Sequence, residues 1–275
     1  MKAYKPLTFF QYVNLFFKYS KQNMKATLEY KLDKSLLAVA VLVRELINVT
    51  IMYLILNRFV RIKGWEMNEL FFLYSFLFLS YSICVFFSTG IRDFDMLVRN
   101  GDFDRFLLRP FGLISQIIVH NVDYPAFIGH GSIGVILFFR TANAVGIQWN
   151  LHNIIYCILA LAGGTLIQIS LMIIASSFSF LTINATNLRN LIFFNSRRFV
   201  GYPISFYPAL IQKFLIFIIP FAFVNYFPAV FLLDKQEELV YGGFFYLTPV
   251  VGLIFLGLSI CFWKYGLKKY VSTGS

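Results

Sequence analysis

Charged side chains are scarce in this chain. Only 13% of its 275 residues are Asp, Glu, Lys or Arg, whereas 59% are hydrophobic. Soluble domains have about a quarter charged and about half apolar residues, so this composition argues against a water-soluble fold. The apolar residues also form long runs, which predicts that the chain folds within a lipid bilayer.

Several signatures of metal, redox and nucleotide chemistry are missing. The three cysteines, Cys84, Cys157 and Cys261, lie inside apolar stretches and lack the close spacing of disulfide frameworks or zinc sites. The three histidines form no metal-ligand motif with nearby acids. No G-x-x-x-x-G-K-[ST] sequence is present, so we expect any ATP and its magnesium to be bound by a partner. We therefore expect no cofactor or metal in this chain, and an intramembrane enzyme centred on the histidines is an alternative function.

Six apolar runs are long enough to cross a bilayer, which requires about 20 residues in a helix. They predict an all-α integral membrane protein with six transmembrane helices, at about 36–57, 70–90, 112–139, 151–183, 209–231 and 245–265. The transmembrane domain would then cover 36–275. It would follow a cytoplasmic amphipathic segment over 1–35.

The segment over 8–28 separates its apolar and basic residues on a helix. Phe9, Phe16 and Met24 share an apolar stripe, whereas Lys18 and Lys21 lie on another face. The stretch is too charged to cross a membrane. This pattern predicts an interfacial helix along the inner leaflet.

Positive charge predicts the orientation. The chain has 24 Lys and Arg against 13 Asp and Glu, and cytoplasmic loops of membrane proteins are rich in cations. With the N-terminus inside, 17 of the 24 cations are on the cytoplasmic side and five are outside; the 17 include Arg189, Arg197 and Arg198 in a predicted fourth loop. Both termini are therefore expected in the cytoplasm, and the excess charge requires no nucleic-acid partner.

The predicted loop over 91–110 mixes arginines and aspartates with apolar residues. Gly101 permits a left-handed turn, Asp102 can cap a following helix, and Pro110 disfavours a helical conformation at Arg109. The pattern predicts a short amphipathic helix exposed at the cytoplasmic face.

Two interpretations of this exposed helix are open. In the first, it docks in a groove of another protein, with Phe103, Phe106 and Leu107 as apolar anchors and Arg109 in a charge-assisted contact. In the second, it lies on the membrane surface. Loss or survival of binding to a partner after mutation distinguishes the two.

Ionisable residues inside the predicted spans are functional candidates, because charge at membrane depth is costly. Arg44 and Glu45 are adjacent, and adjacent residues point about 100° apart on a helix, so we do not expect a simple pair between them. The favoured interpretation places both near the inner headgroups, with Arg44 snorkelling. With Asp123, they are the basis of an alternative function, an ion- or proton-coupled secondary transporter.

The run over 218–233 contains Pro220, Asn225 and Pro228 among bulky apolar residues. Proline removes backbone donors, and a helix broken at membrane depth must be shielded by protein or line a cavity. The alternative to such a broken helix is a single span that crosses the membrane with a proline kink.

Three segments carry a resemblance to a known family. They are Gly64-Trp65 with the following ELFFLY, then NGDFDRFLLRP over 100–110, and IIPFAFVNYFPAVFLL over 218–233. Together they resemble permease subunits of ABC-2 type exporters, in the bacterial branch of multidrug and antimicrobial-peptide export. The likeness extends over nearly the whole chain.

The resemblance implies a function and a set of partners. The chain would be a multi-pass permease in a bacterial plasma membrane, exporting an amphipathic or apolar drug, peptide or lipid-like molecule. Its partners would be a dimer of ATP-binding-cassette ATPase subunits, a second identical or homologous permease, and the bilayer. The coupling helix that contacts the ATPase would include Gly101, Asp104, Leu107, Leu108, Arg109 and Pro110. The segment 218–244 would include a re-entrant hairpin that caps the pathway.

Overall fold

The structure is a computed structural model. It describes residues 9–58, 61–109, 112–182, 185–195, 199–235 and 243–271. Within these ranges the chain is helical and contains no strand, which confirms the predicted all-α class.

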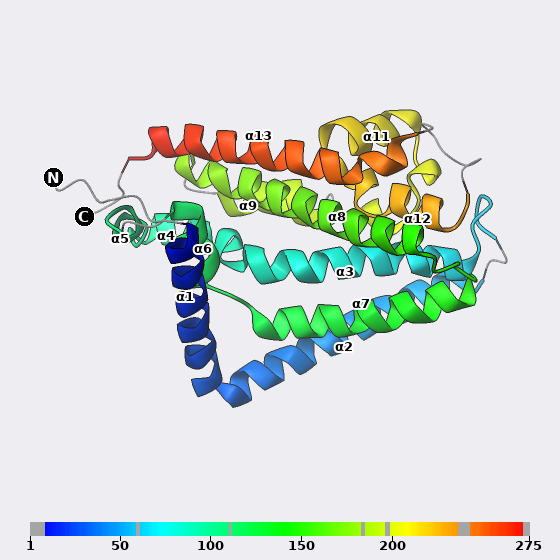
Figure 1. The fold of residues 1–275 in the computed structure, drawn as a ribbon, viewed down its shortest axis with the longest axis horizontal. Helices are drawn as coiled ribbons and strands as arrows, with labels where there is room; N and C mark the ends of the chain where they lie inside the picture. The colour runs from blue at the N-terminus through cyan, green and yellow to red at the C-terminus, as the bar shows by residue number, and fades with distance from the viewer. Residues whose placement is uncertain are drawn as a thin grey trace.

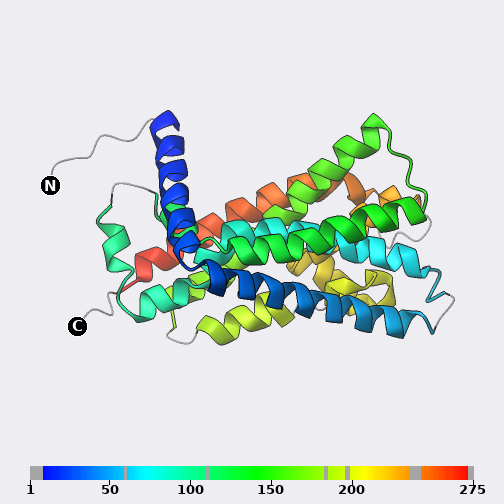
Figure 2. The same cartoon turned by 90° about the horizontal axis from the view of Figure 1, so that it is seen from below.

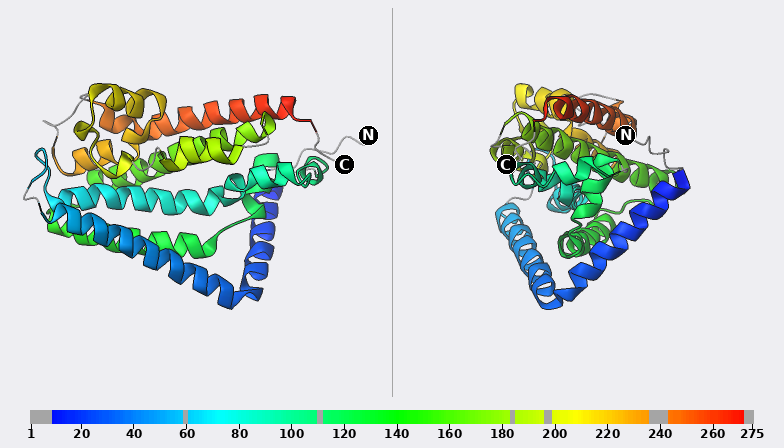
Figure 3. Two further views of the ribbon diagram at one scale, coloured as in Figure 1. Left: turned by 180° about the vertical axis from the view of Figure 1, so that it is seen from behind. Right: turned by 90° about the vertical axis from the view of Figure 1, so that its left-hand side faces the viewer.

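Five long helices form the body of the molecule. They are α2 (Lys31–Leu56), α3 (Met67–Arg92), α7 (Tyr124–Ala144), α8 (Leu151–Ser177) and α13 (Thr248–Lys269). They run side by side in the spatial order α2, α7, α3, α8, α13 (Figures 1 and 3). We call the end of the bundle that holds the last turn of α13 the proximal end, and the opposite end the distal end.

Four stretches are long and apolar enough to cross a membrane as continuous helices: Lys31–Leu56, Met67–Arg99, Leu151–Phe180 and Phe244–Lys269. Two further candidates are bent pairs, Leu113–His120 with Tyr124–Ala144 and Ala209–Ile218 with Phe221–Leu232. The described part of the chain therefore has four to six candidate spans. The predicted number of six applies only if each bent pair counts as one crossing.

The N-terminal helix α1 (Phe9–Glu29) lies across the proximal end, nearly perpendicular to the bundle (Figures 1 and 3). Its Asn23 side chain donates to the carbonyl of Val119 at 3.3 Å, and the Tyr124 hydroxyl donates to the carbonyl of Ser20 at 3.3 Å. An amphipathic helix in the plane of a membrane takes this direction relative to spanning helices.

The predicted span over 112–139 is not one straight helix. A short helix α6 (Leu113–His120) meets α7 at an angle of 80°. The break occurs because α7 has its own start: Asp123 is its N-cap and accepts from the Ala126 amide at 2.9 Å, and Pro125 occupies the first turn. Asp123 therefore caps a new helix within this run.

The predicted cytoplasmic loop between 184 and 208 instead runs along the bundle, from the proximal end to the distal end. α9 (Ala185–Arg189) and the π-helical η2 (Asn190–Asn195) pack along α8 from the proximal end. After η3 (Phe199–Gly201) and η4 (Ile204–Phe206), the carbonyl of Phe206 accepts from Lys63, which lies in the distal turn between α2 and α3. The segment packs along the bundle because Phe193 and Val200 are buried in the core. Arg197 and Arg198 lie outside the described residues.

The predicted span over 209–231 is a helical hairpin at the distal end. Its first limb is α11 (Ala209–Lys213) with η5 (Phe214–Ile218), and its second is η6 (Phe221–Phe223) with α12 (Tyr226–Leu232), bent by 79°. The chain enters and leaves the hairpin at the distal end, because Lys63 contacts the carbonyl of Phe206 just before α11 and Lys235, just after α12, donates to the carbonyl of Gly64 at 2.8 Å. The bend lies at 219–220, before the outer part of 218–244 in which the resemblance implied a re-entrant hairpin, and residues 236–242 of that part lie outside the described residues.

Helices α8 and α13 pack against each other through small residues. α8 is extended by η1 (Phe178–Phe180), and η8 (Phe244–Leu247) leads into α13. A Cβ atom added to Gly163 on α8 would lie 2.6 Å from the Thr248 carbonyl oxygen at the start of α13, and one added to Gly252 would lie 2.7 Å from the carbonyl oxygen of Gly163. The two backbones therefore touch, as small residues allow in membrane helix pairs.

Candidate functional site

The proximal end carries the segment that the sequence singled out, residues 91–109. It forms two short helices, α4 (Phe94–Arg99) and α5 (Asp104–Leu107), which are separated by a turn. Gly101 has φ +74° in this turn, the left-handed conformation that only glycine adopts readily, which confirms its predicted role. The prediction for Asp102 is wrong: it does not cap α5, and it pairs with Arg105 at 3.4 Å.

Two of the predicted apolar anchors are inside the chain. Phe103 is fully buried, and its ring packs against Phe94 and Tyr270 with centroids 5.0 and 5.1 Å away. Phe106 is 5% exposed and packs against the His120 ring. A helix of four residues cannot be stable alone, so these rings hold α5 on the bundle. The prediction that they fill a partner's groove is therefore wrong for this conformation.

Four other side chains of the segment point outward. Leu108 is 85% exposed and Leu107 45% exposed, and Arg105 and Arg109 are also exposed. The Arg109 guanidinium lies 5.4 Å from the centre of the Phe106 ring, which orients it. We call these four residues the exposed edge. Pro110, the next predicted residue, lies outside the described residues.

Asp104 has an internal role. Its carboxylate accepts a hydrogen bond from the Tyr270 hydroxyl at 3.0 Å, which ties α5 to the end of α13. This residue of the predicted coupling element therefore positions the segment, together with Phe103.

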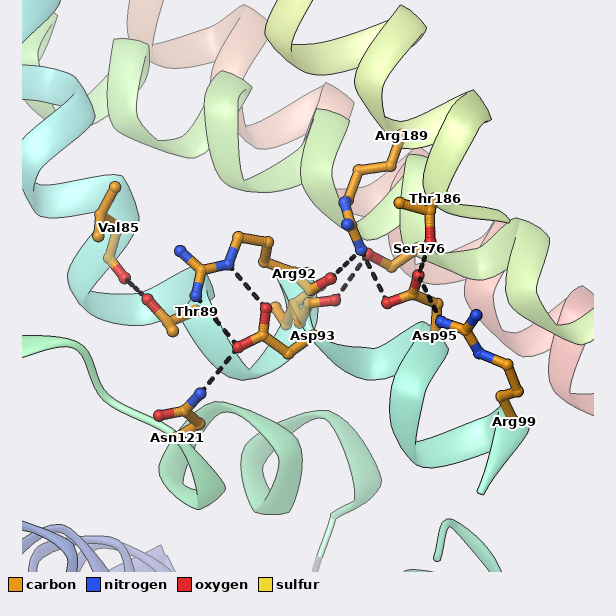
Figure 4. Close-up of polar contacts among 11 residues, drawn as sticks. Val85, Thr89, Arg92, Asp93, Asp95, Arg99, Asn121, Ser176, Thr186 and Arg189 are labelled. Atoms are coloured by element: carbon orange, nitrogen blue, oxygen red, sulfur yellow. Dashed lines mark hydrogen bonds and ion pairs between the residues drawn. The ribbon is translucent and has the colours of Figure 1, made fainter. Parts of the chain in front are cut away.

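A buried ion pair joins α4, the first helix of the segment, to α9 (Figure 4). The Asp95 carboxylate of α4 is 2.8 Å from Arg189 Nη1 of α9, and the two side chains are only 5% and 12% exposed. Asp95 also accepts from the Thr186 hydroxyl, and Arg189 also donates to the carbonyl of Arg92. Arg99, one turn along α4, is 3.9 Å from the same carboxylate. These contacts lock α4 to α9.

The same network extends to three other elements (Figure 4). Arg92 at the end of α3 pairs with Asp93 at 2.7 Å, and Asp93 accepts from Asn121, between α6 and α7, at 2.8 Å. The Ser176 hydroxyl of α8 donates to the carbonyl of Ile91 at 2.7 Å. A displacement of α4 would therefore act on α3, α7, α8 and α9 together.

The intramembrane charges on α2 do pair with each other. Arg44 Nε donates to Glu45 Oε1 at 2.9 Å, because the long arginine side chain folds back along the helix. Asn48 donates to Glu45 Oε2 at 3.1 Å, and Arg44 Nη2 lies 3.3 Å from His130 Nε2 of α7. The expectation of no simple pair is wrong. Asp123 is separate from this cluster, because it caps α7.

Asn225 fastens the distal hairpin to the bundle. Its side chain is buried and donates to the carbonyl of Val200 at 2.6 Å and to that of Leu73 at 3.4 Å. Pro220 lies at the break between the two limbs, where a missing amide donor does no harm. Pro228 is third in α12, another position where an amide has no partner within the helix. The bend therefore arises at Pro220, and Pro228 is tolerated in a regular turn.

Comparison with families of known proteins matches residues 42–274 to the family described as ABC-2 family transporter protein. The match covers most of the chain. The protein belongs to the ABC-2 transporter family. Neither the curated proteins nor the solved structures include a significant match.

Membership of the ABC-2 family confirms the resemblance noted in the sequence. It makes the chain a multi-pass membrane component of a transporter, and the family implies association with an ATP-binding-cassette ATPase subunit. Among the described residues of this ABC-2 protein, no three His, Cys, Asp or Glu side chains come together to hold a metal ion.

Sequence analysis missed the roles of Asp95, Thr186 and Arg189 in this ABC-2 protein. The alternation of arginine and aspartate over 91–110 was a signal for ion pairing. The partner of Asp95, however, lies more than 90 residues further along the chain, in a stretch that was expected to be a loop. No local pattern connects the two.

Proposed function

We propose that this chain is the permease subunit of an ATP-binding-cassette exporter in a bacterial plasma membrane. Its proximal end faces the cytoplasm and binds a dimer of separate ATPase subunits, which hold ATP and magnesium. A second permease, identical or homologous, completes the pathway. The cargo is an amphipathic or apolar molecule, and the chain itself changes its helix packing without covalent chemistry.

One observation carries the proposal: an exposed edge rests on a buried polar network. Leucine and arginine side chains such as Leu108 and Arg109 can anchor a protein interface. Phe103 and Asp104 hold the edge on α4 and on the end of α13, and the Asp95–Arg189 pair holds α4 on α9. Such a connection transmits a displacement of a bound partner to the helices, which is what an ATPase-driven permease requires.

The outer face of α2 supports the membrane setting. Only 17% of the most apolar stretch of α2 is buried inside the chain. Large side chains such as Leu37, Leu46 and Leu54 are more than half exposed. Surfaces of this kind are stable against lipid or against another apolar helix. Both surroundings are part of the proposed assembly.

The test is co-purification of the ATPase with epitope-tagged permease from native membranes. The double variant Leu108→Ala/Arg109→Ala should reach the membrane at normal abundance but retain at least about tenfold less ATPase, since interface anchors are each worth about 1–3 kcal/mol. Leu210→Ala is the matched control, because Leu210 is 81% exposed but lies on the distal hairpin.

Two outcomes contradict the proposal. Full ATPase retention and export in the double variant would show that the exposed edge does not couple the subunits, as a segment lying on the membrane predicts. Loss of ATPase only in Leu210→Ala would place the ATPase at the distal end. Phe106→Ala should instead lower the stability of the permease itself, because Phe106 is an internal residue.

A further inference from the structure

A cavity of about 510 Å³ opens halfway along the bundle, between α2 and the short helical segments η2 and η3. One wall is polar and consists of Arg44, Glu45, Asn48 and His130. The adjoining wall is apolar and includes Ile51, Met52 and Ile55, one to two turns further along α2. In Figure 2, α2 and the helix over 185–195 lie next to each other. The arrangement is amphipathic, with a polar and an apolar half.

The polar wall depends on a close approach of two helices. A Cβ atom added to Gly129 of α7 would lie 2.7 Å from a methyl carbon of Val41 on α2. Because Gly129 has no side chain, α2 lies directly against α7 at this level. His130, the next residue, is therefore brought within 3.5 Å of Glu45.

The charges in this wall are not equally available. The Glu45 carboxylate is turned into the protein, since its side chain is 6% exposed and is surrounded by Arg44, Asn48 and His130. The Arg44 side chain is 59% exposed, and its Nε and Nη2 atoms make the internal contacts. Among the described residues, its Nη1 atom takes part in no hydrogen bond or ion pair with a side chain. The charged group offered to the cavity is the outer edge of a guanidinium.

If α2 spans the bilayer, this guanidinium lies far from both membrane surfaces. Arg44 is 13 residues from Lys31 and 12 from Leu56, so it lies about 20 Å from one end of α2 and about 18 Å from the other. Its hydrogen bond to Glu45 and its contact with His130 keep the guanidinium beside this part of the helix. Lipid tails cannot solvate such a charge, so the cavity must supply water or a polar partner.

We propose that this cavity binds the exported molecule and that the molecule is an amphipathic acid. Its carboxylate or phosphate accepts hydrogen bonds from the Arg44 guanidinium, while its apolar part lies along Ile51, Met52 and Ile55. The inward-facing Glu45 and His130 position Arg44 from two helices. The assignment of the ligand as cargo rests on the proposed exporter function, whereas the binding site itself does not.

The test uses the full chain in nanodiscs of neutral lipid and a fluorescent probe, dansyl-undecanoic acid, with its methyl ester as the uncharged counterpart. The wild-type protein should bind the acid saturably and at least about tenfold more tightly than the ester, because a charge-assisted contact is lost in the ester. Competition by dodecanoate and by dodecyl phosphate shows whether a carboxylate or a phosphate is preferred.

Three variants locate the binding. Arg44→Gln/Glu45→Gln removes both charges together, which avoids an unpaired buried carboxylate, and should abolish the preference for the acid. Ile51→Trp fills the cavity without altering the polar wall and should weaken both probes. Arg58→Gln, which neutralises an exposed cation just beyond α2, should leave both affinities unchanged.

Equal affinity for acid and ester in the wild-type protein would overturn the inference. A preference for the acid that survives Arg44→Gln/Glu45→Gln would overturn it too. ATPase co-purification, measured on the same preparations, tests the exporter function separately. Probe binding without ATPase association would refute that function alone, and ATPase association without an acid preference would refute only the inferred site.

Discussion

Neutralising Asp95 should destabilise the proximal end far more than neutralising any exposed acid nearby. Asp95 and Arg189 are 2.8 Å apart and only 5% and 12% exposed, so water cannot replace either partner. Asp95→Asn keeps the shape of the side chain and an acceptor for Thr186. It leaves the Arg189 guanidinium buried without a counter-ion.

The expected cost follows from this burial. Breaking a buried ion pair by removing one partner costs about 3–5 kcal/mol, whereas an exposed pair is worth up to about 1 kcal/mol. Arg189 keeps one contact, to the carbonyl of Arg92, so we expect a cost near the lower value, about 3 kcal/mol. The matched control is Asp102→Asn, because Asp102 pairs with Arg105 at 3.4 Å and the two side chains are 42% and 78% exposed.

The measurement is the free energy of unfolding of the purified chain, from titration with dodecyl sulfate in mixed micelles followed by circular dichroism. The double variant Asp95→Asn/Arg189→Gln should be less destabilised than the sum of the two single variants, by about 1–3 kcal/mol. The reasoning is refuted if Asp95→Asn costs no more than Asp102→Asn, or if the two single effects simply add.

Two further predictions concern the distal hairpin and the orientation. Asn225→Leu leaves the carbonyls of Val200 and Leu73 without their donor, so it should lower the stability of the protein by about 1–3 kcal/mol and impair export while ATPase still co-purifies. The control is Asn143→Leu, because Asn143 is exposed, and normal export in Asn225→Leu would show that the hairpin is not needed. In a background without native cysteines, Asn143→Cys should react with an impermeant thiol reagent in intact cells and Leu108→Cys should not; the opposite pattern would invert the topology.

The sequence by itself determined the class of the protein and its local features. Long apolar runs predict helices in a bilayer, since each such helix satisfies its own backbone and needs only apolar surroundings. The conformation of Gly101 is also a local property, because a left-handed residue in a turn favours glycine wherever the turn lies. The family resemblance depended on short contiguous motifs, and it too could be recognised without a fold.

Only the tertiary structure decided how these elements are used. Phe103 and Phe106 have the spacing of docking anchors, but Tyr270 covers Phe103 and His120 covers Phe106. The stretch around Arg189 is rich in cations, as a cytoplasmic loop would be, but it packs along the bundle because Phe193 and Val200 are buried in the core. Arg44 would be a snorkelling residue in an isolated helix, but in the folded chain it contacts Glu45 and His130 near the middle of α2. The contacts of Phe103 with Tyr270, of Arg189 with Asp95 and of Arg44 with His130 join residues far apart in sequence, and such contacts exist only once the helices have packed.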